Sequence, residues 1–219
     1  GPMGPGSEMG GGRMMGMHGG MDGGDVDYSL YLINGRAPAD PDVLQAEPGQ
    51  RLRLRVINAA ADTNIRVVNC TTAAQYFHVL RRQALLLKTD PLPLIVMTPK
   101  SLLRHGFTAS TPAELADGKF QRVIDDTLTA AQALKVRRLV LCSGKVAVDL
   151  MTSEQRKNNA NVAIARVEQL YPFPATTIGD VVARYPKLRE VCWVQEEPEN
   201  MGAWEFVRPL LEQLIDKRW

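Results

Sequence analysis

The stretch VRRLVLCSGKVAVDLMTSEQRK, residues 136–157, carries the pattern that decides the fold. A short apolar run through Cys142 leads into Ser143 and Gly144, and residues with the spacing of an amphipathic helix follow. Buried strands are short and continuously apolar, whereas helices repeat apolar residues three and four positions apart. The stretch therefore predicts a strand, a tight turn at Gly144 and a helix, which is the repeating unit of an α/β sheet.

The same alternation continues on both sides of this stretch. Further strands are predicted in PLPLIVMTPK (91–100), NVAIARVEQL (161–170) and EVCWVQEE (190–197). Further helices are predicted in AQYFHVLRRQALLLK (74–88), IGDVVARY (178–185) and WEFVRPLLEQLIDKR (204–218). Apolar strands that alternate with amphipathic helices favour an α/β fold, a mostly parallel mixed sheet with helices on both faces.

The helix predicted near residue 74 has a clear periodic pattern. Its apolar residues recur at helical spacing, at Tyr76, Phe77, Leu80, Ala84 and Leu87. Cys70-Thr71-Thr72 precedes it, and a threonine at this point is a good N-cap because its hydroxyl can accept from a free backbone N–H.

The first 63 residues have a different character. Residues 1–27 hold more than half of the chain's glycines and methionines and almost no β-branched residues, so we expect a disordered linker. Residues 28–63 contain YSLYLING and RLRLRVIN, which alternate like exposed strands around turns. They predict a short hairpin-like β segment. The remainder divides into a linking helix region, 64–91, and an α/β domain, 92–219.

Composition excludes several classes of function. Apolar residues make up 45% of the chain, charged residues 23%, and the net charge is only +2. This balance predicts neither nucleic acid nor a membrane surface as a partner. The cysteines, Cys70, Cys142 and Cys192, lie far apart with no CxxC pair, so a zinc site or a disulfide framework is not expected. Inert buried thiols and a reducing, cytoplasmic setting fit this pattern.

Two resemblances follow from particular motifs. LINGRAPADPDVLQAEPGQRLRLRVINAAADT resembles the start of the second cupredoxin domain of a bacterial multicopper oxidase, preceded by its Met-rich spacer. Copper centres of that family rest on HxH clusters, and His18, His78 and His105 stand alone, so no oxidase activity is carried over. The weak candidates for Cu(I) in the spacer are Met14, Met15, Met17, His18 and Met21.

The second resemblance covers the chain from about residue 64 to its end. NIRVVNCTTAAQYFHVLRRQ, LPLIVMTPKSLLRH, FQRVIDD, RLVLCSGKV, VEQLYPFP and WVQEEPENMGAW occur in this order. Together they resemble the carboxy-terminal region of the thiamine-dependent, decarboxylating component of 2-oxoglutarate dehydrogenase. The fold implied is that of a transketolase carboxy-terminal domain. The chain thus looks like a chimera joined near Asp62–Asn64, whether natural, engineered or an assembly error.

The resemblance also indicates which part of the family's decarboxylation activity this chain could carry out. The family holds thiamine diphosphate and Mg²⁺ through a GDG…N loop, and the nearest string is Ala116-Asp117-Gly118-Lys119. We expect no cofactor bound by this chain alone, no catalytic residue and no decarboxylation. The resemblance implies that the parent protein is an enzyme of the tricarboxylic acid cycle. It implies assembly as a homodimer or in the parent complex with dihydrolipoyl succinyltransferase. It also implies acetyl-CoA or a nucleotide as a possible effector.

The polar residues allow a few candidate sites. An anion, effector or interface role is a hypothesis for Lys100, Arg104, His105, Lys145 and Arg166. Ser143-Gly144-Lys145 departs from a phosphate loop, because Val146 replaces its hydroxyl residue. Glu196 and Glu197 are adjacent on a predicted strand, which would direct them to opposite faces. Capping or interface roles are therefore favoured for Glu196, Glu197, Glu199 and Asn200.

Three functions remain open from the sequence. The first is a fragment of the dehydrogenase component that supplies its carboxy-terminal assembly and regulatory domain. The second is a copper-related module from a truncated multicopper oxidase. The third is a dimer-forming interaction domain without chemistry of its own.

Overall fold

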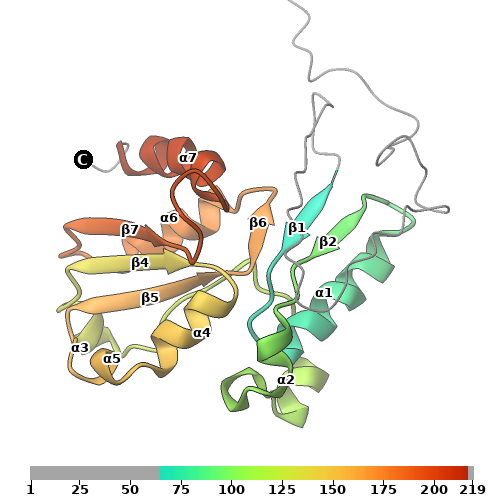
Figure 1. Cartoon of the computed structure of the whole chain (residues 1–219), viewed down its shortest axis with the longest axis horizontal. Coiled ribbons are helices and arrows are strands. Elements are labelled where there is room, and N and C mark those ends of the chain that lie inside the picture. The colour runs from blue at the N-terminus through green and yellow to red at the C-terminus, as the bar shows by residue number, and fades with distance from the viewer. Residues whose placement is uncertain (1–64, 217–219) are drawn as a thin grey trace, which may run out of the picture.

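The structure is a computed structural model that describes residues 65–216. The predictions for the linker 1–27, the β segment 28–63 and the copper candidates lie outside these residues. Within them the chain forms two small sheets with helices around each, as Figure 1 shows. The predicted α/β class with mostly parallel strands is confirmed.

One sheet has three strands in the order β2-β1-β6. β1 (Arg66–Val68) runs parallel to β2 (Leu94–Val96) and antiparallel to β6 (Gln169–Tyr171). Helix α1 (Ala73–Leu86) connects the two parallel strands. The predicted threonine cap is confirmed, because the hydroxyl of Thr72 accepts from the backbone N–H of Gln75 at 3.2 Å.

The other sheet has four strands in the order β3-β5-β4-β7. β4 (Arg138–Cys142) is central and runs parallel to both β5 (Val162–Val167) and β7 (Glu190–Val194). β3 (Val123–Ile124) pairs antiparallel with β5 at one edge. β7 forms the opposite edge.

The division into two sheets was not predicted, and the chain passes from β5 of one sheet to β6 of the other at a single residue. The single strand expected over 161–170 is two strands, because β5 ends at Val167 and β6 begins at Gln169. Glu168 between them is fully buried and its carboxylate is held by Thr71 at the start of α1. The chain therefore leaves one sheet and enters the other at this glutamate.

Helices cover both faces of the four-stranded sheet. α4 (Lys145–Thr152) packs on one face against Cys142 and Ile164. α6 (Ala175–Ala183) and α7 (Trp204–Asp216) pack on the other, where the main core gathers. Leu139 and Leu141 of β4 belong to that core, while Val140 and Cys142 face α4, as the two-residue period of a strand requires.

The remaining elements are short. A turn at Ser153 ends α4, and α5 (Glu154–Lys157) follows as a separate helix instead of the continuous one predicted. The elements η2 (Lys100–Arg104), η3 (Gly106–Thr108) and α2 (Pro112–Asp117) lie between β2 and β3, and α3 (Ala130–Ala133) lies between β3 and β4.

Helix α1 buries a different face from the one its apolar pattern marks. The residues against the rest of the fold are Ala74, Gln75, His78 and Val79. In contrast Tyr76, Phe77 and Leu80 are 44%, 45% and 43% exposed. The helix prediction is confirmed, but its most apolar side faces outward.

Candidate functional site

A hollow of about 260 Å³ lies where parallel strands of both sheets end. It is lined from the ends of β1, β2, β4 and β7, by Asn69, Met97, Thr98, Pro99, Ser143, Lys145, Val146, Glu196 and Glu197. Open α/β sheets bind ligands beyond the carboxyl ends of their strands. This hollow is therefore the best candidate site within residues 65–216.

Gly144 allows the two sheets to meet at this point. Its φ is +67°, a conformation that side chains rarely adopt, and a Cβ here would lie 2.6 Å from Cγ of Asn69. Glycine lacks the Cβ and tolerates both conditions. The turn predicted at Gly144 is thus confirmed, and its packing against the end of β1 adds a second reason for glycine.

The electrostatics of the hollow centre on Lys145. Its Nζ forms an ion pair with Asp149 one helical turn away and another with Glu196 at 3.3 Å. The hydrogen bond to Asp149, and then the one to Glu196, raises the pKa of Lys145 above its usual value. Glu197 adds a further carboxylate to the lining. The described lining is therefore net acidic, so an anion here would have to displace carboxylates from Lys145.

The expectation that Glu196 and Glu197 point to opposite faces is wrong. β7 ends at Val194, so both residues lie in the loop that follows the strand, where the two-residue alternation no longer applies. Both line the hollow.

Arg166 lies in a separate polar group at the junction of the sheets. Its guanidinium donates to Oγ1 of Thr71 at 2.8 Å and stacks 5.6 Å from the ring of Phe107. The same hydroxyl donates to Glu168, and the backbone N–H of Thr71 donates to the other carboxylate oxygen at 2.9 Å. Burial raises the pKa of Glu168, although the hydrogen bonds from Thr71 and the charge of Arg166 act in the opposite direction.

The other predicted site residues do not reach the hollow. Lys100 and Arg104 are exposed on η2. His105 is half-buried, and its Nδ1 accepts from the backbone N–H of Phe107 at 3.2 Å. The five candidates therefore divide into three groups. Lys145 lies at the strand ends, Arg166 and His105 both contact Phe107, and Lys100 and Arg104 lie at the surface.

Sequence reasoning missed Asn69, Thr71 and Glu168. A glutamate inside the apolar run VAIARVEQL was the available signal, since carboxylates are almost never fully buried without partners. Its partner Thr71 is 97 positions away, which no local pattern reveals.

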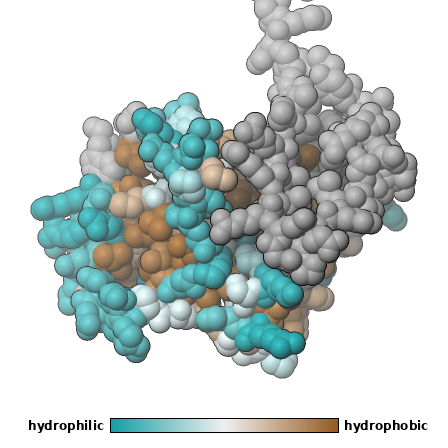
Figure 2. Space-filling view, viewed as in Figure 1, coloured by the Kyte–Doolittle hydropathy of each residue, from teal (hydrophilic) through white to brown (hydrophobic). Residues whose placement is uncertain are grey.

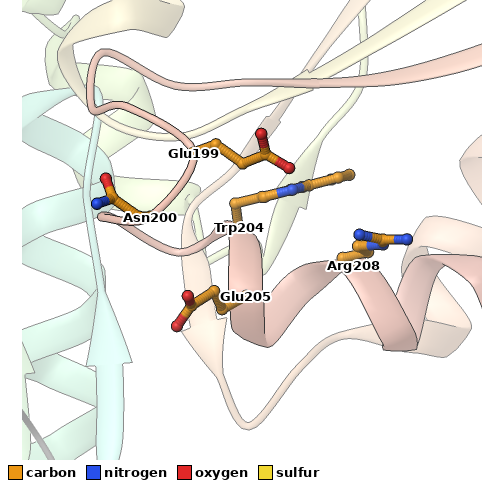
Figure 3. A pocket seen from close by; sticks show the side chains of 5 residues that line it. All are labelled: Glu199, Asn200, Trp204, Glu205 and Arg208. Atoms are coloured by element: carbon orange, nitrogen blue, oxygen red, sulfur yellow. The ribbon is translucent and has the colours of Figure 1, made fainter.

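A second hollow, of about 430 Å³, lies at the start of α7. Figure 3 shows Glu199 and Arg208 near the indole of Trp204, whereas Asn200 and Glu205 point away from it. The guanidinium of Arg208 is also paired with Glu212 at 2.9 Å. These charges do not converge on one position, so this hollow is the weaker candidate.

The string closest to a diphosphate loop is not built to hold thiamine diphosphate. The string closest to a diphosphate loop, Ala116 to Lys119, lies at the carboxyl end of α2, with Gly118 as the C-cap. A Cβ at Gly118 would lie 2.5 Å from Nε2 of His78, and Arg81 donates to the Gly118 carbonyl at 3.0 Å. Packing against α1 therefore accounts for this glycine.

Residues 65–216 contain no group of three or more histidine, cysteine or acidic side chains placed to hold a metal ion. No helix in this part of the chain is long and apolar enough to cross a membrane.

Fold and site together define an α/β unit whose candidate pocket lies beyond the carboxyl ends of its parallel strands. Residues 109–219 match the family described as 2-oxoglutarate dehydrogenase C-terminal. The chain belongs to this family.

Curated relatives extend the match. The 2-oxoglutarate dehydrogenase E1 components of Bacillus cereus strains G9842 and B4264 are 45% identical over 190 residues, which is 84% of this chain. That stretch is only 19% of each relative, so the chain spans about a fifth of their length and fits a fragment of such a component. Because residues 64–219 make up less than 84% of the chain, the match also extends before Asn64.

Proposed function

We propose that this chain supplies the carboxy-terminal assembly and regulatory part of a 2-oxoglutarate dehydrogenase E1 component and does not decarboxylate 2-oxoglutarate alone. The observation that carries the proposal is 45% identity along 84% of the chain, confined to 19% of the relative. A match of this kind supports descent from the E1 component. It leaves most of the relative outside the matched part.

A turnover assay tests the absence of activity. In such enzymes bound thiamine diphosphate supplies the carbanion chemistry of decarboxylation. The full chain is incubated with 2-oxoglutarate, thiamine diphosphate, Mg²⁺ and ferricyanide as electron acceptor. We expect background rates, with a full-length E1 component from Bacillus cereus as the positive control. Reduction of ferricyanide above background, dependent on thiamine diphosphate, would contradict the proposal.

A role in assembly is supported by the outer side of α1. Tyr76, Phe77, Leu80 and Leu85 are all more than two-fifths exposed, and apolar helix faces of this kind are usually covered by protein. We propose that the chain joins a homodimer, mixed dimers with full-length E1, or a complex containing dihydrolipoyl succinyltransferase.

Co-purification tests the assembly role. Tagged chain should retain full-length E1, and Leu80→Glu should weaken that retention at least tenfold because a charge is placed in the apolar side of α1. Leu134→Glu is the matched control, since Leu134, the C-cap residue after α3, is 51% exposed and lies away from α1 in the sequence. Equal loss in both variants, or no retention by the original chain, would count against the proposal.

A regulatory role remains a proposal for the two polar groups. Acetyl-CoA or a nucleotide would use cations from the set predicted above, Lys100, Arg104, His105, Lys145 and Arg166. The position of Lys145 beyond the strand ends supports this role. Calorimetric titration with acetyl-CoA and with AMP tests it, using Lys145→Ala against Lys135→Ala as an exposed control. Absence of heat at millimolar ligand would refute it.

The copper-related module stays an alternative prediction, resting on sequence motifs outside the described residues. A Cu(I) competition assay with bicinchoninate distinguishes this alternative from the proposed dehydrogenase fragment. His18→Ala is the test variant and His105→Ala is the control.

A cytoplasmic location is likewise a proposal, and cell fractionation checks it.

A further inference from the structure

Exposed cations gather at the amino end of the four-stranded sheet. Because β4, β5 and β7 are parallel, the loops that precede them lie together, at the opposite end from the hollow. Backbone hydrogen bonds of 2.8 Å join these loops, from Arg189 to the carbonyl of Arg137 and from Arg137 to the carbonyl of Asn161. Figure 1 shows this end on the side away from the three-stranded sheet, and Figure 2 shows hydrophilic surface there. We define the basic end as Lys135, Arg137, Lys187 and Arg189, which are all exposed.

One sequence pattern builds both halves of the basic end. Lys135-Val136-Arg137 precedes β4, and Lys187-Leu188-Arg189 precedes β7. The central apolar residue of each triplet belongs to the main core, where Val136 is 0% and Leu188 is 5% exposed. Burial of the central residue fixes each loop against the core and leaves a cation at the surface on both sides of it.

The backbone holds two of these cations next to each other. Arg138 of β4 is in register with Glu190 of β7, and their side chains form an ion pair at 2.7 Å. One residue earlier, Arg137 and Arg189 are neighbours of like charge, at the usual strand separation of about 4.8 Å. Like charges opposite each other destabilise a sheet, so this pair does not contribute to the stability of the fold.

No described residue neutralises the basic end. Its four side chains form no ion pair with any residue from 65 to 216. In contrast, the arginines close by in the sequence are paired, Arg138 with Glu190 and Arg184 with Asp125. Unpaired cations that the backbone holds together create a positive potential, which favours a partner of opposite charge.

We propose that the basic end binds an acidic segment of a partner protein, a run of aspartate and glutamate side chains. The arginine fork matches a carboxylate through two parallel hydrogen bonds, and each lysine adds a point charge. Nucleic acid suits this surface less well, because single strands are held by aromatic side chains that stack on the bases, and neither triplet contains one. Loop geometry, exposure and charge alone define this surface, so it is independent of the family assignment.

Anisotropy of a fluorescein-labelled octaglutamate peptide, titrated with the full chain, measures this binding. We expect saturable binding that weakens as the ionic strength rises, because salt screens exposed charges. Arg137→Glu/Arg189→Glu should raise the dissociation constant at least tenfold. Lys88→Glu/Lys119→Glu is the matched control, since both lysines are exposed, lie outside the loops of the four-stranded sheet and change the net charge equally. At physiological ionic strength this control should bind the peptide like the original chain.

Arg189→Glu by itself separates binding from folding. The new carboxylate would lie beside Arg137, so attraction replaces repulsion between the two loops. We expect a urea midpoint equal to or above that of the original chain, together with weaker binding of the peptide. A midpoint below that of the original chain would show that Arg189 stabilises the fold, and it would overturn the argument from repulsion.

Four results overturn the proposal. The first is an original chain that does not bind the peptide at low ionic strength. The second is equal loss in both double variants, which would reflect net charge alone. The third is tighter binding of an oligothymidylate than of the peptide, which would assign the surface to nucleic acid. The fourth is self-association, measured by light scattering, that only Arg137→Glu/Arg189→Glu abolishes, which would assign the surface to a second copy.

Discussion

Replacing Gly144 by alanine tests how the two sheets are joined. Its φ of +67° strains any residue with a Cβ, which costs about 1–3 kcal/mol. The new Cβ would also lie 2.6 Å from Cγ of Asn69, and overpacking of this kind costs about 1–3 kcal/mol. We expect Gly144→Ala to lower the free energy of unfolding by about 3 kcal/mol in total.

The two contributions can be separated with Asn69→Ala. Truncating Asn69 removes the atoms that the new Cβ would meet but leaves the φ unchanged. We therefore expect the double variant Asn69→Ala/Gly144→Ala to recover about 1–2 kcal/mol relative to the sum of the single variants. The recovered part measures the contact between β1 and the turn after β4.

Urea unfolding, followed by circular dichroism, measures these values from the midpoint at unchanged slope. Gly106→Ala is the matched control, because a Cβ at Gly106 meets nothing within 4 Å, and it should change stability by less than about 0.5 kcal/mol. A Gly144→Ala variant as stable as this control would refute the backbone argument. Strict additivity in the double variant would refute the contact with Asn69.

Three further variants test the buried polar groups and the cap of α1. The pKa of Glu168 is raised, so the folded state binds the carboxyl proton more tightly than the unfolded state does. The stabilisation from this bound proton is fully present below the ordinary glutamate pKa of 4.5 and is lost as the pH rises above it. Glu168→Gln should therefore gain stability relative to the original chain as the pH increases above 4.5. A difference between the urea midpoints of the two proteins that stays constant over that pH range would contradict this. Asp126→Ala should cost about 3 kcal/mol in thermal unfolding, because the fully buried carboxylate pairs with Arg156 at 2.6 Å and accepts from the backbone N–H of Ile164 at 2.9 Å. Glu154→Ala, which breaks the exposed pair with Lys157, is its control and should cost less than about 0.5 kcal/mol. Thr72→Ala should cost about 1 kcal/mol by loss of the N-cap of α1, and an unchanged melting temperature would show that this cap adds nothing.

Local patterns predicted the elements well. The strand, turn and helix around Gly144, the helix capped by Thr72 and the closing helix α7 all follow from spacing over a few residues. The break between α4 and α5 at Ser153 and the split of the strand at Glu168 were not predicted. At Ser153 the apolar spacing stops, since residues 152–159 are all polar, and at Glu168 a carboxylate interrupts an apolar run. Both signals were present in the sequence but were not used.

The candidate site could be predicted only in part. Lys145 was found because it follows a predicted strand and turn, and the structure places it in the hollow. Its partner Glu196 is 51 positions away, and the distribution of Lys100, Arg104, His105 and Arg166 over separate groups depends on how η2 and η3 fold. The sequence alone did not show which of these candidates lie together in space.

The sequence by itself determined the alternation of strands and helices, the glycine turn and the family, because these reside in the order and spacing of neighbouring residues. Only the tertiary structure decided that the described residues form two sheets and that α1 turns Tyr76, Phe77 and Leu80 outward. The physical reason is that pairing and burial depend on residues distant in sequence. Glu168 illustrates this, since the hydroxyl and N–H of Thr71 satisfy its carboxylate from 97 positions away.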